Sequence, residues 1–262
     1  MISKNGYADG EQVGLKSSWN YADFSEINSG KATVYLSEKN RNNIIVGLNA
    51  GHGTKGGTHK KTWCHPDKSK TVTGGTTPEG SKMAMAVSDG MAFSDGTPER
   101  TINLREAQIV KELLLSKGYD VFMIRESEDV QLDNIARTVI CNNVADCHIS
   151  IHWDEDDLNY DKGCYYYSVP DEIKYLDSVS SVWEESERLG NSILSGLKNN
   201  GNAIFKSGKV DMDLTQTSYS TIPSVTIELG NQCSDYCDDN LLKIANGLAD
   251  GIDLYFSRLY SL

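Results

Sequence analysis

The chain has 262 residues, 39% of them hydrophobic and 24% charged, and its 37 acidic and 25 basic residues give a formal net charge of -12. This length suits one α/β domain whose core needs neither a disulfide nor a metal to be stable. The negative charge argues against nucleic acid as a partner, and no apolar run approaches the roughly 20 residues that cross a bilayer.

The first 40 residues are polar, with scattered aromatic side chains. Their beginning, MISKNGYADGEQ, contains no apolar core of the kind that a secretory signal needs. Either the protein is not exported by that route, or a leader has already been removed. We expect residues 1–40 to be a loosely attached extension that ends in a short edge strand at residues 32–36.

Apolar runs and helical periodicities alternate along the remaining chain. Strands are predicted at residues 44–48, 120–124, 146–152, 163–169 and 224–230. Helices are predicted from Glu99 to a C-terminal cap at Gly118, and at residues 132–144, 182–197 and 239–259. This alternation predicts an α/β fold with a mostly parallel sheet and helices on both faces, in a single domain.

A long segment between the first strand and the first helix does not fit this alternation. Residues 56–98 are rich in Gly, Thr, Ser and Lys. A connection of this length is too long for a compact domain unless it is functional or mobile. We therefore treat residues 56–98 as an insert.

Residues with metal-binding or acid–base chemistry stand where predicted elements begin or end. His52 follows the first strand within a Gly-His-Gly tripeptide, His152 and Glu228 come at the ends of later strands, and Glu99 begins the first long helix. Two histidines and one carboxylate are the protein ligands of many catalytic zinc sites, and a further carboxylate can move a proton. The alternative is that each is a hydrogen-bonding or ion-paired residue at a strand end.

Four blocks of the sequence together resemble the zinc-dependent N-acetylmuramoyl-L-alanine amidases of the amidase-3 family. They are VGLNAGHGTKGG, ERTINLREAQIVKELLLSKGYDVFMIRESED, NNVADCHISIHWD and IPSVTIELGN, in the order that the family has. The resemblance implies that His52, Glu99 and His152 bind Zn²⁺ and that Glu228 is the catalytic carboxylate.

The same resemblance implies a fold and a reaction. The fold is a twisted, mixed sheet of the phosphorylase/hydrolase-like kind, with the catalytic domain over residues 41–262. The reaction is hydrolysis of the amide bond between the lactyl group of N-acetylmuramic acid and L-alanine in peptidoglycan. Peptidoglycan and muropeptides are then the partners, and the place of action is extracellular or in the cell wall.

The chain departs from the family pattern in three places. Trp153 and Asp154 replace a small residue and Asn, Asn231 stands where the family has Phe, and the insert is longer than the family's connection. We interpret the first two as changes at the rim of the cleft. Together the departures bear on substrate preference.

Other candidate residues receive structural interpretations. His148 shares a strand face with His152 but lies about 13 Å away, so it cannot bind the same metal. Glu106, two helical turns after Glu99, is interpreted as a solvated charge or as a charge on the helix face. His65, like His59, is interpreted as a polar loop residue.

Arg125 and the six cysteines are also given structural interpretations. Arg125 is interpreted as the partner of a nearby carboxylate such as Glu126 or Asp129. The six cysteines lack the Cys-x-x-Cys pairs of a structural zinc site. Cys233 and Cys237 either pair locally or stay free.

Two other functions compete with the amidase reaction. A zinc carboxypeptidase or aminopeptidase would use the same ligands on peptides. A catalytically inactive wall-binding module would need one of the four site residues to be missing, and all four are present. The sequence leaves the oligomeric state and the stem-peptide preference open.

Overall fold

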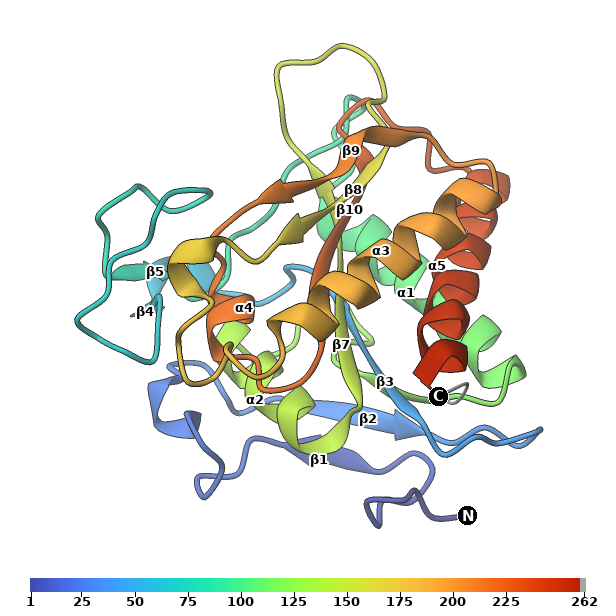
Figure 1. Cartoon of the computed structure of the whole chain (residues 1–262), viewed down its shortest axis with the longest axis horizontal. Coiled ribbons are helices and arrows are strands. Elements are labelled where there is room, and N and C mark those ends of the chain that lie inside the picture. The colour runs from blue at the N-terminus through green and yellow to red at the C-terminus, as the bar shows by residue number, and fades with distance from the viewer. Residues whose placement is uncertain (260–262) are drawn as a thin grey trace.

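Eight strands form one mixed sheet in the computed structural model of the chain, which describes residues 1–259 (Figure 1). Their order across the sheet is β1-β2-β6-β3-β7-β10-β8-β9. Neighbouring strands from β6 to β10 are parallel, β2 and β8 flank them as antiparallel strands, and β9 pairs parallel with β8. In chain order the bounds are Gln12–Gly14 (β1), Lys31–Tyr35 (β2), Ile45–Ala50 (β3), Asp120–Met123 (β6), Cys147–Asp154 (β7), Cys164–Ser168 (β8), Ile204–Asp211 (β9) and Ser224–Asn231 (β10).

The helices cover both faces of this sheet (Figure 1). The α-helices are Glu99–Ser116 (α1), Asn134–Val144 (α2), Trp183–Asn199 (α3), Thr215–Tyr219 (α4) and Asp238–Leu259 (α5), and the 3₁₀ turns are Ala22–Phe24, Gly57–His59 and Asp171–Ile173. On one face α1, α3 and α5 bury Leu48 and Ile151, and on the other face α2 buries Ile45 and Phe122. Every residue of β3 and β10 is buried, which is how central parallel strands covered on both faces behave.

Glycine allows α3 and α5 to pack closely. A Cβ placed on Gly196 would lie 2.3 Å from the carbonyl oxygen of Gly247 and 2.3 Å from the nitrogen of Gly251. No side chain fits in that space, so the two helix backbones meet directly. None of the helices between residues 1 and 259 is long and apolar enough to cross a membrane.

The predicted fold class is confirmed, and the four predicted helices are present with similar bounds. The sequence did not reveal β1, β9, α4 or the small hairpin in the insert. β9 has the sequence IFKSGKVD and is mostly exposed at the sheet edge. A strand of this kind lacks the apolar pattern on which the prediction of strands depends.

Residues 1–40 are not a loosely attached extension, and β2 is not an edge strand. β2 lies between β1 and β6, so the edge is β1. Val13 from β1 and Val34 from β2 belong to the buried cluster under α2. These short strands contain few apolar residues among many polar ones, so the sequence pattern did not predict that they are attached to the sheet.

The insert is folded against the domain. Its hairpin consists of β4, Lys61–Trp63, and β5, Met83–Met85, in an antiparallel pair (Figure 1). The interpretation of His65 as a polar loop residue is wrong, because it is buried and its Nε2 lies 3.0 Å from both carboxylate oxygens of Asp213. The Tyr219 hydroxyl also donates to the Trp63 carbonyl at 3.1 Å.

We predict that the Asp213→Ala variant loosens the insert. The change leaves the buried His65 ring without its partner and removes an acceptor from the Thr73 amide. Unpaired buried polar groups cost about 1–3 kcal/mol each, so the free energy of unfolding should fall by roughly that amount. Trypsin should then cleave several-fold faster at Lys68 and Lys70, which lie in the insert.

The matched control is Asp67→Asn, which changes an exposed insert carboxylate that accepts hydrogen bonds from the backbone and hydroxyl of Ser69. Cleavage of Asp213→Ala at the control's rate would contradict the role of this pair in holding the insert.

Candidate active site

The turn after β3 presents His52 in an uncommon backbone conformation. Its φ is 62°, in the left-handed region that non-glycine residues rarely adopt. The preceding residue must be glycine, because a Cβ on Gly51 would lie 2.1 Å from Cε1 of His152. Gly-His-Gly therefore allows the ring of His152 to lie against the backbone that carries His52.

Two buried arginines bind the backbone carbonyls of this turn. Arg137 donates to the carbonyls of His52 at 2.6 Å and Ala50 at 3.3 Å. Arg125 donates to the carbonyls of Ala50 at 3.2 Å and Gly51 at 3.1 Å. The interpretation of Arg125 as the partner of a carboxylate is therefore wrong, since its hydrogen bonds go to backbone carbonyls.

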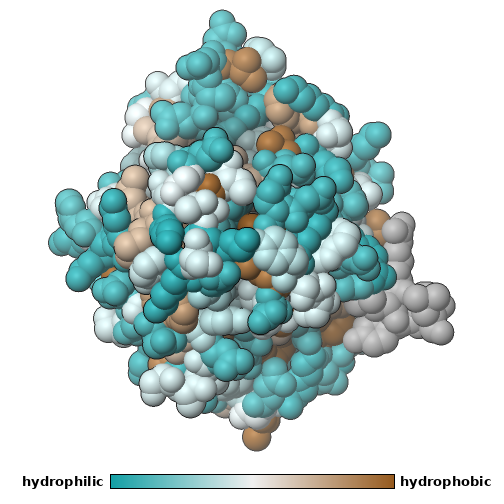
Figure 2. All heavy atoms as spheres, turned by 60° about the vertical axis from the view of Figure 1, so that its left-hand side comes forward, coloured by the Kyte–Doolittle hydropathy of each residue, from teal (hydrophilic) through white to brown (hydrophobic). Residues whose placement is uncertain are grey.

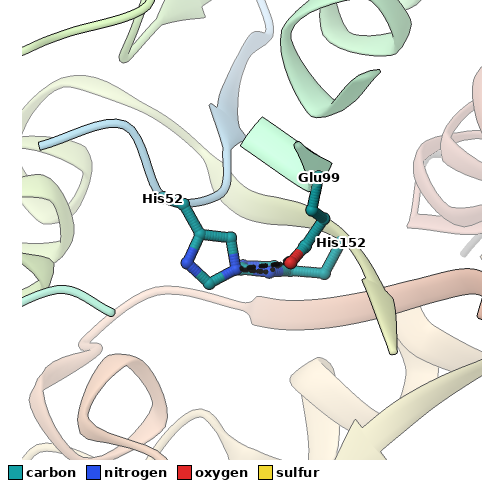
Figure 3. Close-up of side chains that lie close together, drawn as sticks. All are labelled: His52, Glu99 and His152. Carbon is teal, nitrogen blue, oxygen red and sulfur yellow. Dashed lines mark hydrogen bonds and ion pairs between the residues drawn. The ribbon is translucent and has the colours of Figure 1, made fainter. Parts of the chain in front are cut away.

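Three side chains from distant parts of the chain converge beside this turn (Figure 3). Nε2 of His52 lies 3.0 Å from Oε2 of Glu99 and 3.0 Å from Nδ1 of His152. Nδ1 of His152 lies 3.0 Å from Oε1 of Glu99. Within residues 1–259 this is the one group of at least three His, Cys, Asp or Glu side chains with ligand atoms close enough to share a metal ion.

Further hydrogen bonds orient these three side chains. Nδ1 of His52 donates to the Ser88 carbonyl at 2.8 Å, and Nε2 of His152 lies 3.2 Å from the Ser150 hydroxyl. Glu99 accepts from its surroundings through both oxygens. Its donors are the Met91 amide at 3.0 Å, the Asn103 side chain at 3.0 Å and the Trp153 amide at 3.2 Å. Such outer bonds fix the tautomer and the direction of metal ligands.

The donor set fits a cation. Because the Ser88 carbonyl can only accept, Nδ1 of His52 carries the proton and Nε2 of the neutral ring has a free lone pair. That lone pair faces Nδ1 of His152 and the carboxylate of Glu99. The electron pairs of these three groups repel one another unless a proton or a metal ion lies between them. Burial raises the pKa of Glu99, but the two histidines outweigh this effect and hold that pKa well below its ordinary value.

Glu228 lies beside the three residues on the neighbouring strand. It is in register with His152, and it lines the same cleft. Its exposed fraction is 5%, and Oε2 has no hydrogen-bond partner among residues 1–259. Burial, together with the charges of Glu99 and Asp154, raises the pKa of Glu228 well above its ordinary value.

A chain of hydrogen bonds reaches Glu228 from β8. The Tyr167 hydroxyl interacts with the Glu228 carboxylate and lies 3.1 Å from the Tyr165 hydroxyl. Tyr165 donates to Asp154 at 2.5 Å, and Lys162 also pairs with Asp154. The sequence pattern did not predict this chain of hydrogen bonds, although the alternation in GCYYYSV places Tyr165 and Tyr167 on one strand face.

A cleft of about 510 Å³ contains the site. His52, Glu99, His152 and Glu228 all line it. The insert forms much of the lining, and its residues there are Thr58, Cys64, Val72, Thr76, Thr77, Ala84, Met85, Val87, Ser88, Asp89, Gly90 and Met91.

Two side chains that the sequence placed outside the site are buried and have no hydrogen-bond partner in the described part of the chain. His148 is fully buried on the face of β7 that also carries His152, and burial lowers its pKa to about 3. The interpretation of Glu106 as a solvated charge is wrong, because it is 0% exposed and neither oxygen has a hydrogen-bond partner within the described residues. Burial raises the pKa of Glu106 well above its ordinary value.

Two of the departures from the family pattern also lie deeper than the rim of the cleft. The Trp153 side chain is buried against Phe93, and its backbone amide supports Glu99. Asn231 is fully buried and donates to Asp156 and the Tyr160 carbonyl. All six cysteines are free, including Cys233 and Cys237.

One family of known proteins matches most of this chain. The family described as N-acetylmuramoyl-L-alanine amidase matches residues 46–253. A search of curated proteins found no match.

Several solved amidase structures have a fold similar to that of this chain. The amidase Ami1 of Mycobacterium abscessus has a TM-score of 0.67 at 20% identity, over 81% of this chain and 98% of that one. Ami1 of Mycobacterium smegmatis has a TM-score of 0.67 at 18% identity, over 82% and 97%. The CwlD amidase of Clostridioides difficile, solved with the GerS lipoprotein, has a TM-score of 0.55 at 23% identity, over 82% and 100%. At these identities the likeness concerns the fold.

We predict that Arg137→Met destabilises the protein by about 3–5 kcal/mol, the cost of breaking a buried network that holds a charge. The variant removes the donors to the His52 and Ala50 carbonyls. Urea denaturation followed by circular dichroism measures the loss. The control is Arg105→Met, which changes a partly exposed arginine paired with Asp238, and equal stability of the two variants would contradict the proposed role of Arg137.

Proposed function

We infer the chemistry of this chain from its family. The chain belongs to the N-acetylmuramoyl-L-alanine amidase family. The enzyme hydrolyses the amide bond between the lactyl group of N-acetylmuramic acid and L-alanine in peptidoglycan. The observation that carries this function at the level of residues is the convergence of His52, Glu99 and His152 in one cleft with Glu228.

His52, Glu99 and His152 are proposed to hold one Zn²⁺ ion. Two imidazoles and a carboxylate are a zinc donor set that leaves room for reactants. When bound, zinc would supply a Lewis acid that makes water a better nucleophile and polarises the scissile carbonyl. The low pKa of Glu99 keeps its carboxylate ionised, and burial lowers the pKa of His152, which keeps its ring neutral for ligation.

Glu228 is proposed to move the proton of the reaction. Its carboxylate takes a proton from the attacking water and returns it to the nitrogen of the departing L-alanine. In the absence of a metal ion its pKa is raised, and a divalent cation nearby would lower that pKa. The Tyr167 hydroxyl, on β8, which lies on the other side of β10 from β7, contacts the Glu228 carboxylate.

The products separate the amidase from a zinc peptidase. Amidase action on purified peptidoglycan creates new L-alanine amino termini and leaves the glycan intact, whereas a carboxypeptidase or aminopeptidase releases free amino acids. End-group labelling followed by mass spectrometry distinguishes these outcomes. Release of free amino acids without new L-alanine termini would overturn the proposed reaction.

Because the substrate lies in the cell wall, the enzyme is proposed to act outside the cytoplasm. Immunodetection of the native protein in cell fractions tests this location. We expect the protein in the wall or medium fraction, and its confinement to the cytoplasm throughout growth and lysis would contradict the proposal.

We predict about one zinc per chain. His52→Ala and His152→Ala should each lower the zinc content strongly and leave the circular dichroism spectrum unchanged, because the core does not depend on the metal. Metal analysis by mass spectrometry measures the content. His59→Ala, which changes an exposed insert histidine, is the control, and full zinc content in the two site variants would contradict the ligand assignment.

We predict that Glu228→Gln lowers kcat by roughly 10²–10⁴, the usual contribution of acid–base assistance, and leaves the zinc content unchanged. The rate of appearance of L-alanine termini measures kcat. If Glu228→Gln loses zinc while Glu99→Gln keeps it, the roles of the two glutamates are exchanged.

A further inference from the structure

The lining of the cleft is acidic. Its charged residues are the carboxylates Asp89, Glu99, Asp154, Glu155, Asp213 and Glu228, and no Lys or Arg of the described chain lines it. The face that carries the β4–β5 hairpin is also mainly hydrophilic, with only scattered hydrophobic patches (Figure 2). Recognition in this cleft is therefore expected to depend on polar and charged groups.

Some of these carboxylates are already paired with other residues of the protein. Asp154 pairs with Lys162, Asp213 pairs with His65, and Glu99 lies between two histidines. Asp89 and Glu155 are exposed, and neither has a hydrogen-bond or ion-pair partner among residues 1–259. These two carboxylates are free to meet a ligand.

The two free carboxylates come from different segments that line the cleft, and both segments reach the proposed metal ligands. Asp89 belongs to the insert, between Ser88, which accepts from His52, and Gly90. Gly90 approaches the ligands so closely that a Cβ there would lie 2.6 Å from Oε2 of Glu99 and 2.7 Å from Cδ2 of His52. Glu155 follows β7, three residues after His152.

The cleft also contains a buried carboxylate oxygen that a polar ligand can reach. Oε2 of Glu228 is buried and has no hydrogen-bond partner in the chain up to residue 259, although Glu228 lines the cleft. A divalent ion at the metal site would add two positive charges, which ionised Glu99 and Glu228 balance. Asp89 and Glu155 then remain as uncompensated negative charge, and a cleft concentrates such a field.

We propose that Asp89 and Glu155 bind a primary ammonium group of the substrate, so that the enzyme prefers muropeptides with a free amine. The proposal rests on the amidase function and adds the substrate class. An ammonium can come from a diamino acid in the stem peptide or from an amino sugar that has lost its acetyl group. Both sources present the same charge to the two carboxylates.

The experiment compares three soluble muropeptides that share the scissile lactyl–L-alanine bond. One carries a stem lysine with a free side-chain amine, the second carries the same lysine acetylated, and the third carries the acetylated lysine and a free amine on the sugar. Initial rates give kcat/KM for the wild-type zinc enzyme and for the double variant Asp89→Asn/Glu155→Gln.

We expect the wild-type enzyme to prefer a free-amine substrate over the acetylated one by about three- to tenfold, because exposed ion pairs contribute little each. The preference should fall at high salt and should approach one in the double variant. A preference for the first substrate assigns the ammonium to the stem, and a preference for the third assigns it to the glycan.

The control is Glu79→Gln/Asp157→Asn, which removes the same charge from the same two segments outside the cleft lining. This control should keep the wild-type preference. Equal kcat/KM for all three substrates, or a preference that survives in the Asp89→Asn/Glu155→Gln variant, would overturn the inference and leave the amidase function intact. Failure of the wild-type enzyme to cleave any of them would overturn both.

Discussion

The geometry of the site depends on two buried guanidinium groups under the turn after β3. Arg125 and Arg137 donate to the carbonyls of residues 50–52, which the left-handed backbone of His52 turns toward them. Without these donors the carbonyls of Ala50 and His52 would lose their side-chain hydrogen bonds, and the Gly51 carbonyl would keep the Asn103 side chain as its donor at 3.3 Å. The turn therefore keeps its shape because the arginines bind its backbone, and the direction of the His52 ring follows from that shape.

Much of this arrangement can be predicted from the sequence. The apolar runs of β3, β7 and β10 mark them as central strands, and the ends of parallel strands meet at one edge of a sheet. His52, His152 and Glu228 each come at such an end, so their proximity follows from topology. Helical periodicity similarly places Glu99 at the start of α1.

Other features depend on tertiary contacts that no local pattern encodes. Arg137 and Glu106 lie on helices like ordinary charged residues, and only the packed structure shows that both are fully buried. The pairing of His65 with Asp213 joins residues far apart in sequence, so the attachment of the insert could not be predicted from its composition. β1 and β9 are short or polar strands that form because a neighbouring strand offers free backbone groups.

The central claim is that the arginine-held turn places His52 with Glu99 and His152 as the ligands of one metal ion while Glu228 remains outside the ligand set. Anomalous diffraction at the zinc absorption edge, from crystals of the zinc-loaded protein, tests it most directly. We expect one peak about 2.0–2.2 Å from Nε2 of His52, Nδ1 of His152 and a carboxylate oxygen of Glu99. A peak bound by Glu228 in place of Glu99, or no peak at these three residues, would contradict the account.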